Sequence, residues 1–312
     1  EIGVRLVGSE MCIRDRYIRP EIIGLVLGAF LLSFIRGEHQ AKGGSAPMTR
    51  FILGFFVMIG CLMFLGCPFR LILRLAGGDW NAILGFVGFA VGIGAGTFFL
   101  KRGYSLKRTY SLPKFDTAVM PVLMVGLLIL VVMAPAFIFF SEKGPGAVHA
   151  FWAVSLIAGI VVGGLAQYTR LCMVGGIRDI ILFHETKLLM GFVAVFVAAF
   201  LVNLAFGNFH PGFANQPIAH TDGLWNFLGM ALAGFCSILL GGCPMRQLIM
   251  TGEGNTDSAI TVLGLVIGAA FAHNFGLAAS GNGPTFNGEV AVVLGFVVAL
   301  IIAVVNTRKQ GA

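Results

Sequence analysis

Nine long apolar runs constrain the fold of this chain more than any other feature. Each is about as long as the 17–25 residues that a helix needs to cross roughly 30 Å of hydrocarbon. The runs lie near residues 20–36, 48–66, 80–100, 117–140, 147–167, 187–208, 224–242, 257–279 and 288–306. Over the whole chain, 57% of residues are hydrophobic and 11% are charged, which excludes an ordinary soluble domain. We therefore predict an all-α polytopic membrane protein with about nine transmembrane helices.

The basic residues gather in the loops between these runs. The net charge of +7 is therefore a matter of membrane orientation and not a sign of nucleic-acid binding. The loop 101–116 holds five lysines and arginines against one aspartate, so we expect it on the cytoplasmic side. Alternation then places 37–47 and Arg308-Lys309 inside, and 141–146 and 209–223 outside. We expect a multi-pass protein of a bacterial cytoplasmic (inner) membrane.

A tripeptide occurs twice, each time at the end of an apolar run. Gly66-Cys67-Pro68 is followed by Arg70, and Gly242-Cys243-Pro244 is followed by Arg246. We expect the glycine to end the incoming helix with a positive φ, and the proline to open a short helix of the broken or re-entrant type. The cysteine then takes the N-cap position, where the positive end of the helix and the arginine favour an anion. The pattern predicts a soft thiol site suited to a sulfur or selenium anion.

A third motif carries a further cysteine. Arg170-Leu171-Cys172 leads through Gly175-Gly176 to Arg178-Asp179. We expect another helix break here, with Cys172 as a third thiol of the substrate path and both arginines in support, although Arg178 has an alternative role as the partner of Asp179. Cys61 and Cys236 lie in mid-helix without Pro or Arg nearby, and we interpret them as packing residues. Arg74 is expected at the membrane edge.

The duplication extends beyond the tripeptide. Gly78-Asp79 aligns with Gly254-Asn255, and an offset of five spans predicts an inverted-topology repeat with the site at the repeat interface. We divide the chain into a segment at 1–16 that is foreign to the fold, a first repeat at 17–140 that is incomplete, and a second repeat at 141–312, all in one integral membrane domain. The span at 147–167 has no counterpart, so we expect a further span and motif to be missing before Tyr17.

These features resemble the YeeE/YedE family of membrane transporters. The paired Gly-Cys-Pro breaks, the Arg-Leu-Cys motif and the inverted repeat carry the resemblance, which covers the chain from Tyr17 onward. Ile18-Arg-Pro-Glu21, Gly43-Gly-Ser-Ala-Pro47 and Gly66-Cys-Pro-Phe-Arg70 are similar to the YedE branch, assigned to selenium transport, whereas the YeeE branch imports thiosulfate. The resemblance implies cysteines that contact substrate along a central path, here Cys67, Cys172 and Cys243, and a TusA-like sulfurtransferase as a cytoplasmic partner.

Several functions are weighed against one another. The leading hypothesis is uptake of a soft selenium compound, and the alternative is transport of thiosulfate or another sulfur compound. A membrane-embedded thiol redox protein that pairs Cys67 with Cys243, and a purely structural membrane partner, stay open. The histidines and cysteines show no metal-site spacing, and no nucleotide-binding motif occurs. We therefore expect a transporter and not an enzyme, with neither metal nor cofactor.

Overall fold

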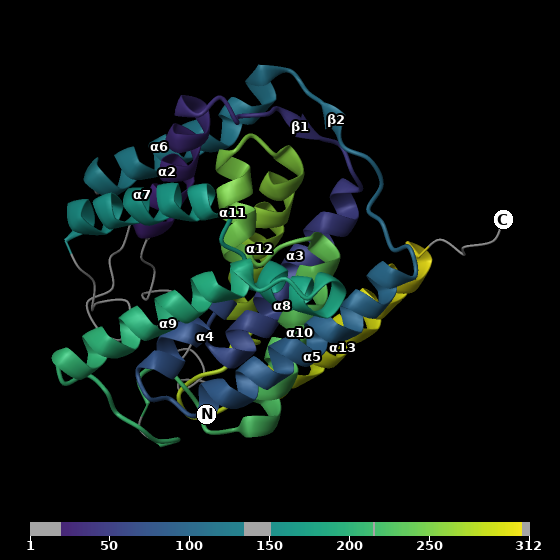
Figure 1. Cartoon of the computed structure of the whole chain (residues 1–312). Helices are drawn as coiled ribbons and strands as arrows, with labels where there is room; N and C mark the ends of the chain where they lie inside the picture. The colour runs from purple at the N-terminus through teal and green to yellow at the C-terminus, as the bar shows by residue number, and fades with distance from the viewer. Residues whose placement is uncertain (1–19, 134–150, 215, 308–312) are drawn as a thin grey trace. The chain divides into compact units, whose positions relative to one another are not determined.

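The computed structural model describes residues 20–133, 151–214 and 216–307, which form helices joined by loops (Figure 1). The long helices are α2 (Pro20–Ile35), α3 (Pro47–Phe64), α5 (Asn81–Lys101), α6 (Lys114–Met133), α7 (Trp152–Thr169), α9 (Lys187–Ala205), α10 (Gly223–Leu240), α12 (Thr256–Asn274) and α13 (Phe286–Val305). The short helices are α4 (Pro68–Ala76), α8 (Met173–Phe183) and α11 (Pro244–Gly252). Strands β1 (Lys42–Gly43) and β2 (Tyr110–Ser111) pair antiparallel.

The predicted fold class is confirmed: the chain is an all-α polytopic membrane protein. In the described residues, seven helical stretches are long and apolar enough to cross a membrane. They are Pro47–Ala76, Asn81–Lys101, Trp152–Phe183, Lys187–Ala205, Gly223–Gly252, Thr256–Asn274 and Phe286–Val305. Two shorter apolar helices, Pro20–Ile35 and Thr117–Met133, stand where the other two of the nine expected spans were placed.

Some expectations fall on residues outside the described part of the chain. These are the segment 1–16, the loop 141–146, the ends of two expected spans at 134–140 and 147–150, and Arg308-Lys309. Where the boundaries can be compared, the apolar runs and the helices agree closely. The short helices predicted after Cys67 and Cys243 are α4 and α11.

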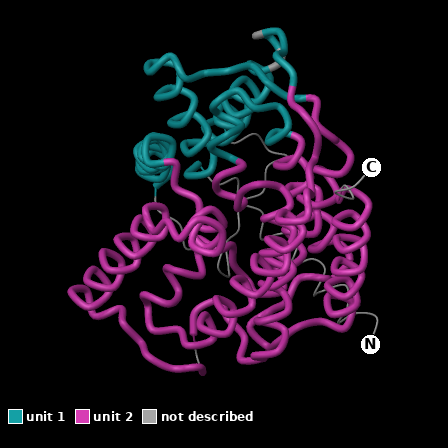
Figure 2. Tube along the Cα trace, turned by 45° about the vertical axis from the view of Figure 1, so that its right-hand side comes forward, with its two compact units in different colours: residues 1–43, 110–169, 248–259 teal, residues 44–109, 170–247, 260–312 magenta. Residues whose placement is uncertain are grey.

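Helical contacts divide the chain into two compact units that interleave along the sequence (Figure 2). Unit 1 comprises residues 1–43, 110–169 and 248–259, and unit 2 comprises 44–109, 170–247 and 260–312. A contact boundary and a repeat boundary are different properties, so the expected repeat halves stay a prediction.

Unit 1 is built on the close packing of α2 against α7. A Cβ added at Gly28 would lie 2.1 Å from the carbonyl oxygen of Ile160, and one at Gly163 would lie 2.3 Å from that of Leu25. The two backbones therefore touch, as small residues allow in membrane helices. Beside this contact, Ile23 and other side chains of α2 pack with side chains of α6.

Unit 2 is built around α10. Of its span, 78% is buried, which is why nearly every residue of this helix is small or apolar. Gly88 and Gly92 of α5 approach carbonyl oxygens of α10 so closely that a Cβ there would lie 2.2 and 2.1 Å away. The aligned Gly264 and Gly268 of α12 approach α3 in the same way, at 2.3 and 2.7 Å. Thus α5, the long helix after the first break, packs on α10, which precedes the second break. In the same way α12, the long helix after the second break, packs on α3, which precedes the first.

The same local geometry follows each short helix of the duplicated pair. Gly78 and Gly254 both have φ of +96°, a left-handed conformation that glycine adopts without steric cost. The carbonyl oxygen of Gly78 accepts from the N–H of Gly212 at 3.0 Å, and that of Gly254 accepts from Lys42 at 3.3 Å. The same turn and the same kind of backbone hydrogen bond therefore recur after both short helices.

Candidate functional site

Three cysteines occupy equivalent positions at the starts of short helices. Cys67, Cys172 and Cys243 immediately precede α4, α8 and α11. Their carbonyl oxygens accept the first backbone hydrogen bonds of these helices, from Leu71 at 2.9 Å, Gly176 at 2.9 Å and Gln247 at 3.0 Å. The N-cap position expected for Cys67 and Cys243 is therefore the one each holds, and Cys172 holds the same position before α8.

Cys172 and Cys243 form a pair of thiols in unit 2. Their side chains are hydrogen-bonded to each other, and both residues are buried, at 6% and 2% exposure. Each sulfur also accepts an N–H from the third residue of its own helix: Gly175 donates to Cys172 at 3.3 Å, and Arg246 donates to Cys243.

Backbone groups link the two helix starts as well. The N–H of Cys243 donates to the sulfur of Cys172, and the N–H of Met173 donates to the sulfur of Cys243. Four backbone donors therefore converge on two sulfurs. Backbone N–H groups at helix starts attract a soft, negatively charged atom to such a place.

The arginine four residues after each Gly of the tripeptide folds back over that glycine. A Cβ on Gly66 would lie 3.1 Å from Cδ of Arg70, and one on Gly242 would lie 3.2 Å from Cγ of Arg246. Arg246 is buried at 8% exposure and interacts electrostatically with Cys172. The glycines thus make room for an arginine stem that runs along the break.

The expectation that Gly66 and Gly242 end the incoming helices with a positive φ is wrong. The residues one position earlier, Leu65 and Gly241, take this conformation, with φ of +61° and +84°. The turn therefore begins one residue sooner. The glycine of the tripeptide leaves space for its arginine side chain, and its own backbone angle is not left-handed.

Cys67 has a different environment from the buried pair. Its thiol is partly exposed and makes no capping hydrogen bond. It lies within electrostatic range of Cys61, which in turn lies near Cys236. The structure therefore brings Cys172 and Cys243 together and places Cys67 among the two cysteines interpreted as packing residues, which are buried at 4% and 0% exposure.

The two arginines of the third motif have different surroundings. Arg170 is exposed and has φ of +57° at the turn between α7 and α8. Arg178 forms an ion pair with the adjacent Asp179, with Nη2 2.7 Å from Oδ1. The alternative role that the sequence left open for Arg178 is therefore the one observed.

Sequence analysis missed a buried ion pair at the end of α4. Arg74, expected at the membrane edge, is only 8% exposed and donates from Nε to Oδ2 of Asp79 at 2.7 Å. Its Nη1 donates to the carbonyl oxygen of Phe64 at 2.6 Å, and its guanidinium lies 4.0 Å from the centre of that residue's ring. The turn between α4 and α5 returns Asp79 to Arg74, which sequence spacing alone does not show.

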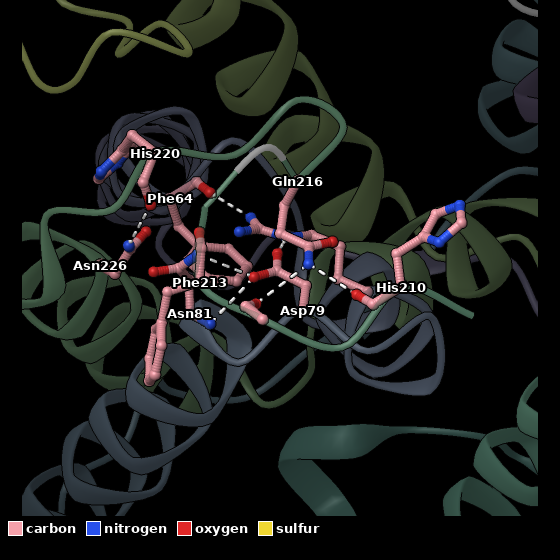
Figure 3. Close-up of polar contacts among 10 residues, drawn as sticks. Phe64, Asp79, Asn81, His210, Phe213, Gln216, His220 and Asn226 are labelled. Carbon is pink, nitrogen blue, oxygen red and sulfur yellow. Dashed lines mark hydrogen bonds and ion pairs between the residues drawn. The ribbon is translucent and has the colours of Figure 1, made fainter. Parts of the chain in front are cut away.

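Residues of the segments 206–214 and 216–222 make polar contacts near Asp79 and Asn81 (Figure 3). Asn81 donates from Nδ2 to Oδ1 of Asp79 at 3.0 Å and to the carbonyl oxygen of Phe213 at 2.7 Å. His220, buried at 1% exposure, lies 2.8 Å through Nε2 from the carbonyl oxygen of Met63, so this nitrogen is the donor. Polar groups from α5 and from these segments thus meet at the end of α3.

All four of the last carbonyl groups of α3 have partners. A helix end leaves these oxygens without intrahelical donors, and each is costly to bury unpaired. The donors are Gly66 N to Cys61, Ala279 N to Leu62, His220 Nε2 to Met63 and Arg74 Nη1 to Phe64. Three of the four donors lie beyond the tripeptide, so the break at Cys67 is held by distant segments.

Comparison with known proteins gives one family. The model of a family described as sulphur transport matches residues 168–309. The match includes Cys172 and Cys243 and covers somewhat less than half of the chain. It begins after Cys67, so that residue lies outside it. No curated protein matches. The part of the chain that contains the thiol pair is thus similar to a sulphur-transport family.

Proposed function

We propose that this chain belongs to the sulphur-transport family and carries a small, soft sulfur anion across a membrane. One observation supports the proposal above all others: the hydrogen-bonded pair of Cys172 and Cys243, at the starts of two short helices. It lies within the matched residues and within a polytopic membrane fold.

The chemistry of the pair suits such an anion. Helix N-termini attract negative charge, and Arg246 adds a formal positive charge beside Cys172. Thiols are weak hydrogen-bond donors, so they hold a substrate loosely. Loose binding at successive sites permits release, as conduction requires. In this proposal Cys172 and Cys243 form one station, and Cys67 forms a separate one.

Sulfur is preferred to selenium as the substrate element. The family match is described as sulphur transport, and the geometry of two thiols does not discriminate between the two elements. Thiosulfate is therefore the first substrate to test, with selenium anions as competitors. A cytoplasmic sulfurtransferase stays an expectation drawn from the resemblance.

Uptake of radiolabelled thiosulfate tests the proposal. Proteoliposomes that contain the full chain should take up thiosulfate and exclude sulfate, because sulfate offers no soft atom to the thiols. Cys172→Ala and Cys243→Ala should each reduce the initial rate at least tenfold, which corresponds to about 1.4 kcal/mol of lost interaction.

Cys236→Ala is the matched control. This cysteine lies in α10, is fully buried, and precedes the break by less than two turns. Its removal should leave the uptake rate within a factor of two of that of the parent chain. Equal loss in all three variants, or no thiosulfate uptake by the parent, would contradict the proposal.

Thiol redox chemistry is the second candidate, because two hydrogen-bonded thiols are placed close together. The pair observed is Cys172 with Cys243, in place of Cys67 with Cys243. Mass spectrometry after exposure to a disulfide oxidant and then to a thiol reductant would show whether a disulfide forms and reopens. Reversible formation without thiosulfate uptake would favour this candidate.

A further inference from the structure

A long helix ends before each Gly-Cys-Pro break, and a short helix begins after it. In both copies a side chain of the short helix donates a hydrogen bond to the last carbonyl oxygen of the long helix. In the first copy, Nη1 of Arg74 donates to the carbonyl oxygen of Phe64 at 2.6 Å. In the second, Nε2 of Gln247 lies 3.4 Å from the carbonyl oxygens of Leu240 and Gly242. Phe64 and Leu240 are counterparts 176 positions apart, so the same carbonyl is held in both copies.

The two copies achieve this contact with different residues. The counterpart of Arg74 is Met250, and the counterpart of Gln247 is Leu71, so neither donor has a polar equivalent. The acceptor is the same in both copies and the donors arise at different turns of the short helix. A chance contact would have no reason to select one carbonyl twice.

Arg74 is itself fixed by its partners. Asp79 accepts from Nε at 2.7 Å, while the peptide N–H and the side chain of Asn81 donate to the other carboxylate oxygen at 2.9 and 3.0 Å. The guanidinium fork therefore spans the carboxylate at the start of α5 and the last carbonyl of α3. Three helix ends are joined at one side chain.

We infer that Arg74 and Gln247 are positioning residues that set the angle of the two Gly-Cys-Pro breaks, and hence the placement of Cys67 and Cys243. Each joins the end of one helix to the body of the next, across three connecting residues of which the last bears the thiol. That these thiols contact a sulfur anion rests on the proposed function, whereas the positioning itself does not.

A double variant tests the first copy without leaving a buried charge unpaired. Arg74→Met with Asp79→Asn gives this break the residues that the second copy carries at Met250 and Asn255. Removal of one partner alone would strand the other charge and could unfold the chain. Because the carbonyl of Phe64 loses its charged donor, Cys67 should sample more orientations.

Alkylation by N-ethylmaleimide, followed by mass spectrometry of the full chain, reads the positions of the thiols directly. In the double variant we expect the alkylation rate of Cys67 to change about tenfold, with that of Cys243 unchanged. Gln247→Leu introduces the residue found at the counterpart position, Leu71. In this variant Cys243 should become exposed and its alkylation rate should change, while that of Cys67 stays the same. This site-selective change is not expected from a general loss of stability.

Arg36→Met with Glu38→Gln is the control, because it removes another arginine–carboxylate ion pair, at 3.1 Å, that is partly exposed and lies outside both Gly-Cys-Pro segments of the sequence. Arg74→Lys gives a milder test if the double variant fails to fold: a single ammonium can keep Asp79 but not also reach Phe64, so an intermediate rate is expected. Unchanged alkylation of Cys67 in folded Arg74 variants would overturn the inference. Absence of thiosulfate uptake with altered alkylation would overturn only the proposed function.

Discussion

At the scale of single residues, the two breaks meet one backbone requirement in different ways. The residue before each tripeptide is left-handed, and it is leucine at 65 and glycine at 241. A left-handed conformation costs a residue with a Cβ roughly 1–2 kcal/mol. Sequence analysis located the break because Gly-Cys-Pro is distinctive. It misassigned the left-handed residue because the second role of Gly66, making room for Arg70, leaves no mark in the sequence.

Gly241→Ala should lower the stability of the chain through the backbone alone. No atom lies within 4 Å of a Cβ added there, so the expected cost of about 1 kcal/mol comes from the φ of +84°. Gly94→Ala is the matched control: it has equally open space, but it lies in the regular helix α5, where alanine should stabilise by roughly 0.5–1 kcal/mol. Thermal unfolding in detergent should therefore shift in opposite directions. A fall of similar size in both variants would contradict this account.

At the scale of helices, the sequence predicts where each helix lies better than which other helices it packs against. Apolar runs mark where helices lie because length and hydropathy are local properties. The packing of α5 on α10 and of α12 on α3 depends on tertiary structure. The glycines that permit it, Gly88 and Gly92 in α5 and Gly264 and Gly268 in α12, are 176 positions apart, like the two tripeptides. Arg74 was missed for the same reason, since its partners depend on how two helices turn and not on periodicity.

Gly28→Ala should weaken the packing of α2 on α7. The added Cβ would lie 2.1 Å from the carbonyl oxygen of Ile160, so the helices must separate, at a cost of about 1–3 kcal/mol for overpacking. Gly164→Ala, on α7 and with its nearest neighbour atom at 3.9 Å, should change the free energy of unfolding little. Unfolding followed by tryptophan fluorescence measures both. Equal stability of the two variants would show that α2 and α7 are not in close contact.

At the scale of the whole molecule, the two Gly-Cys-Pro segments share some features and differ in others, as we expect of diverged copies. Both copies keep the left-handed glycine after the short helix and the carbonyl that is held at the break. They differ in charge, since Arg74 and Asp79 stand where the second copy has methionine and asparagine. The first break is therefore held by charged side chains, whereas the counterpart positions at the second break carry uncharged ones. We therefore expect the stations at Cys67 and at Cys172 with Cys243 to contribute unequally to uptake.

Membrane orientation is the property of the whole chain that charge predicts and that labelling can measure. The loop 101–116 is the most basic and should face the cytoplasm, and the loop 209–223 should face outward. Thr109→Cys and Asn208→Cys place single reporters at exposed positions in or beside these loops. A membrane-impermeant maleimide applied to intact cells should label Asn208→Cys at least tenfold faster than Thr109→Cys, after subtraction of the parent chain. Inside-out vesicles should reverse the order, and labelling of Thr109→Cys from outside would invert the proposed topology.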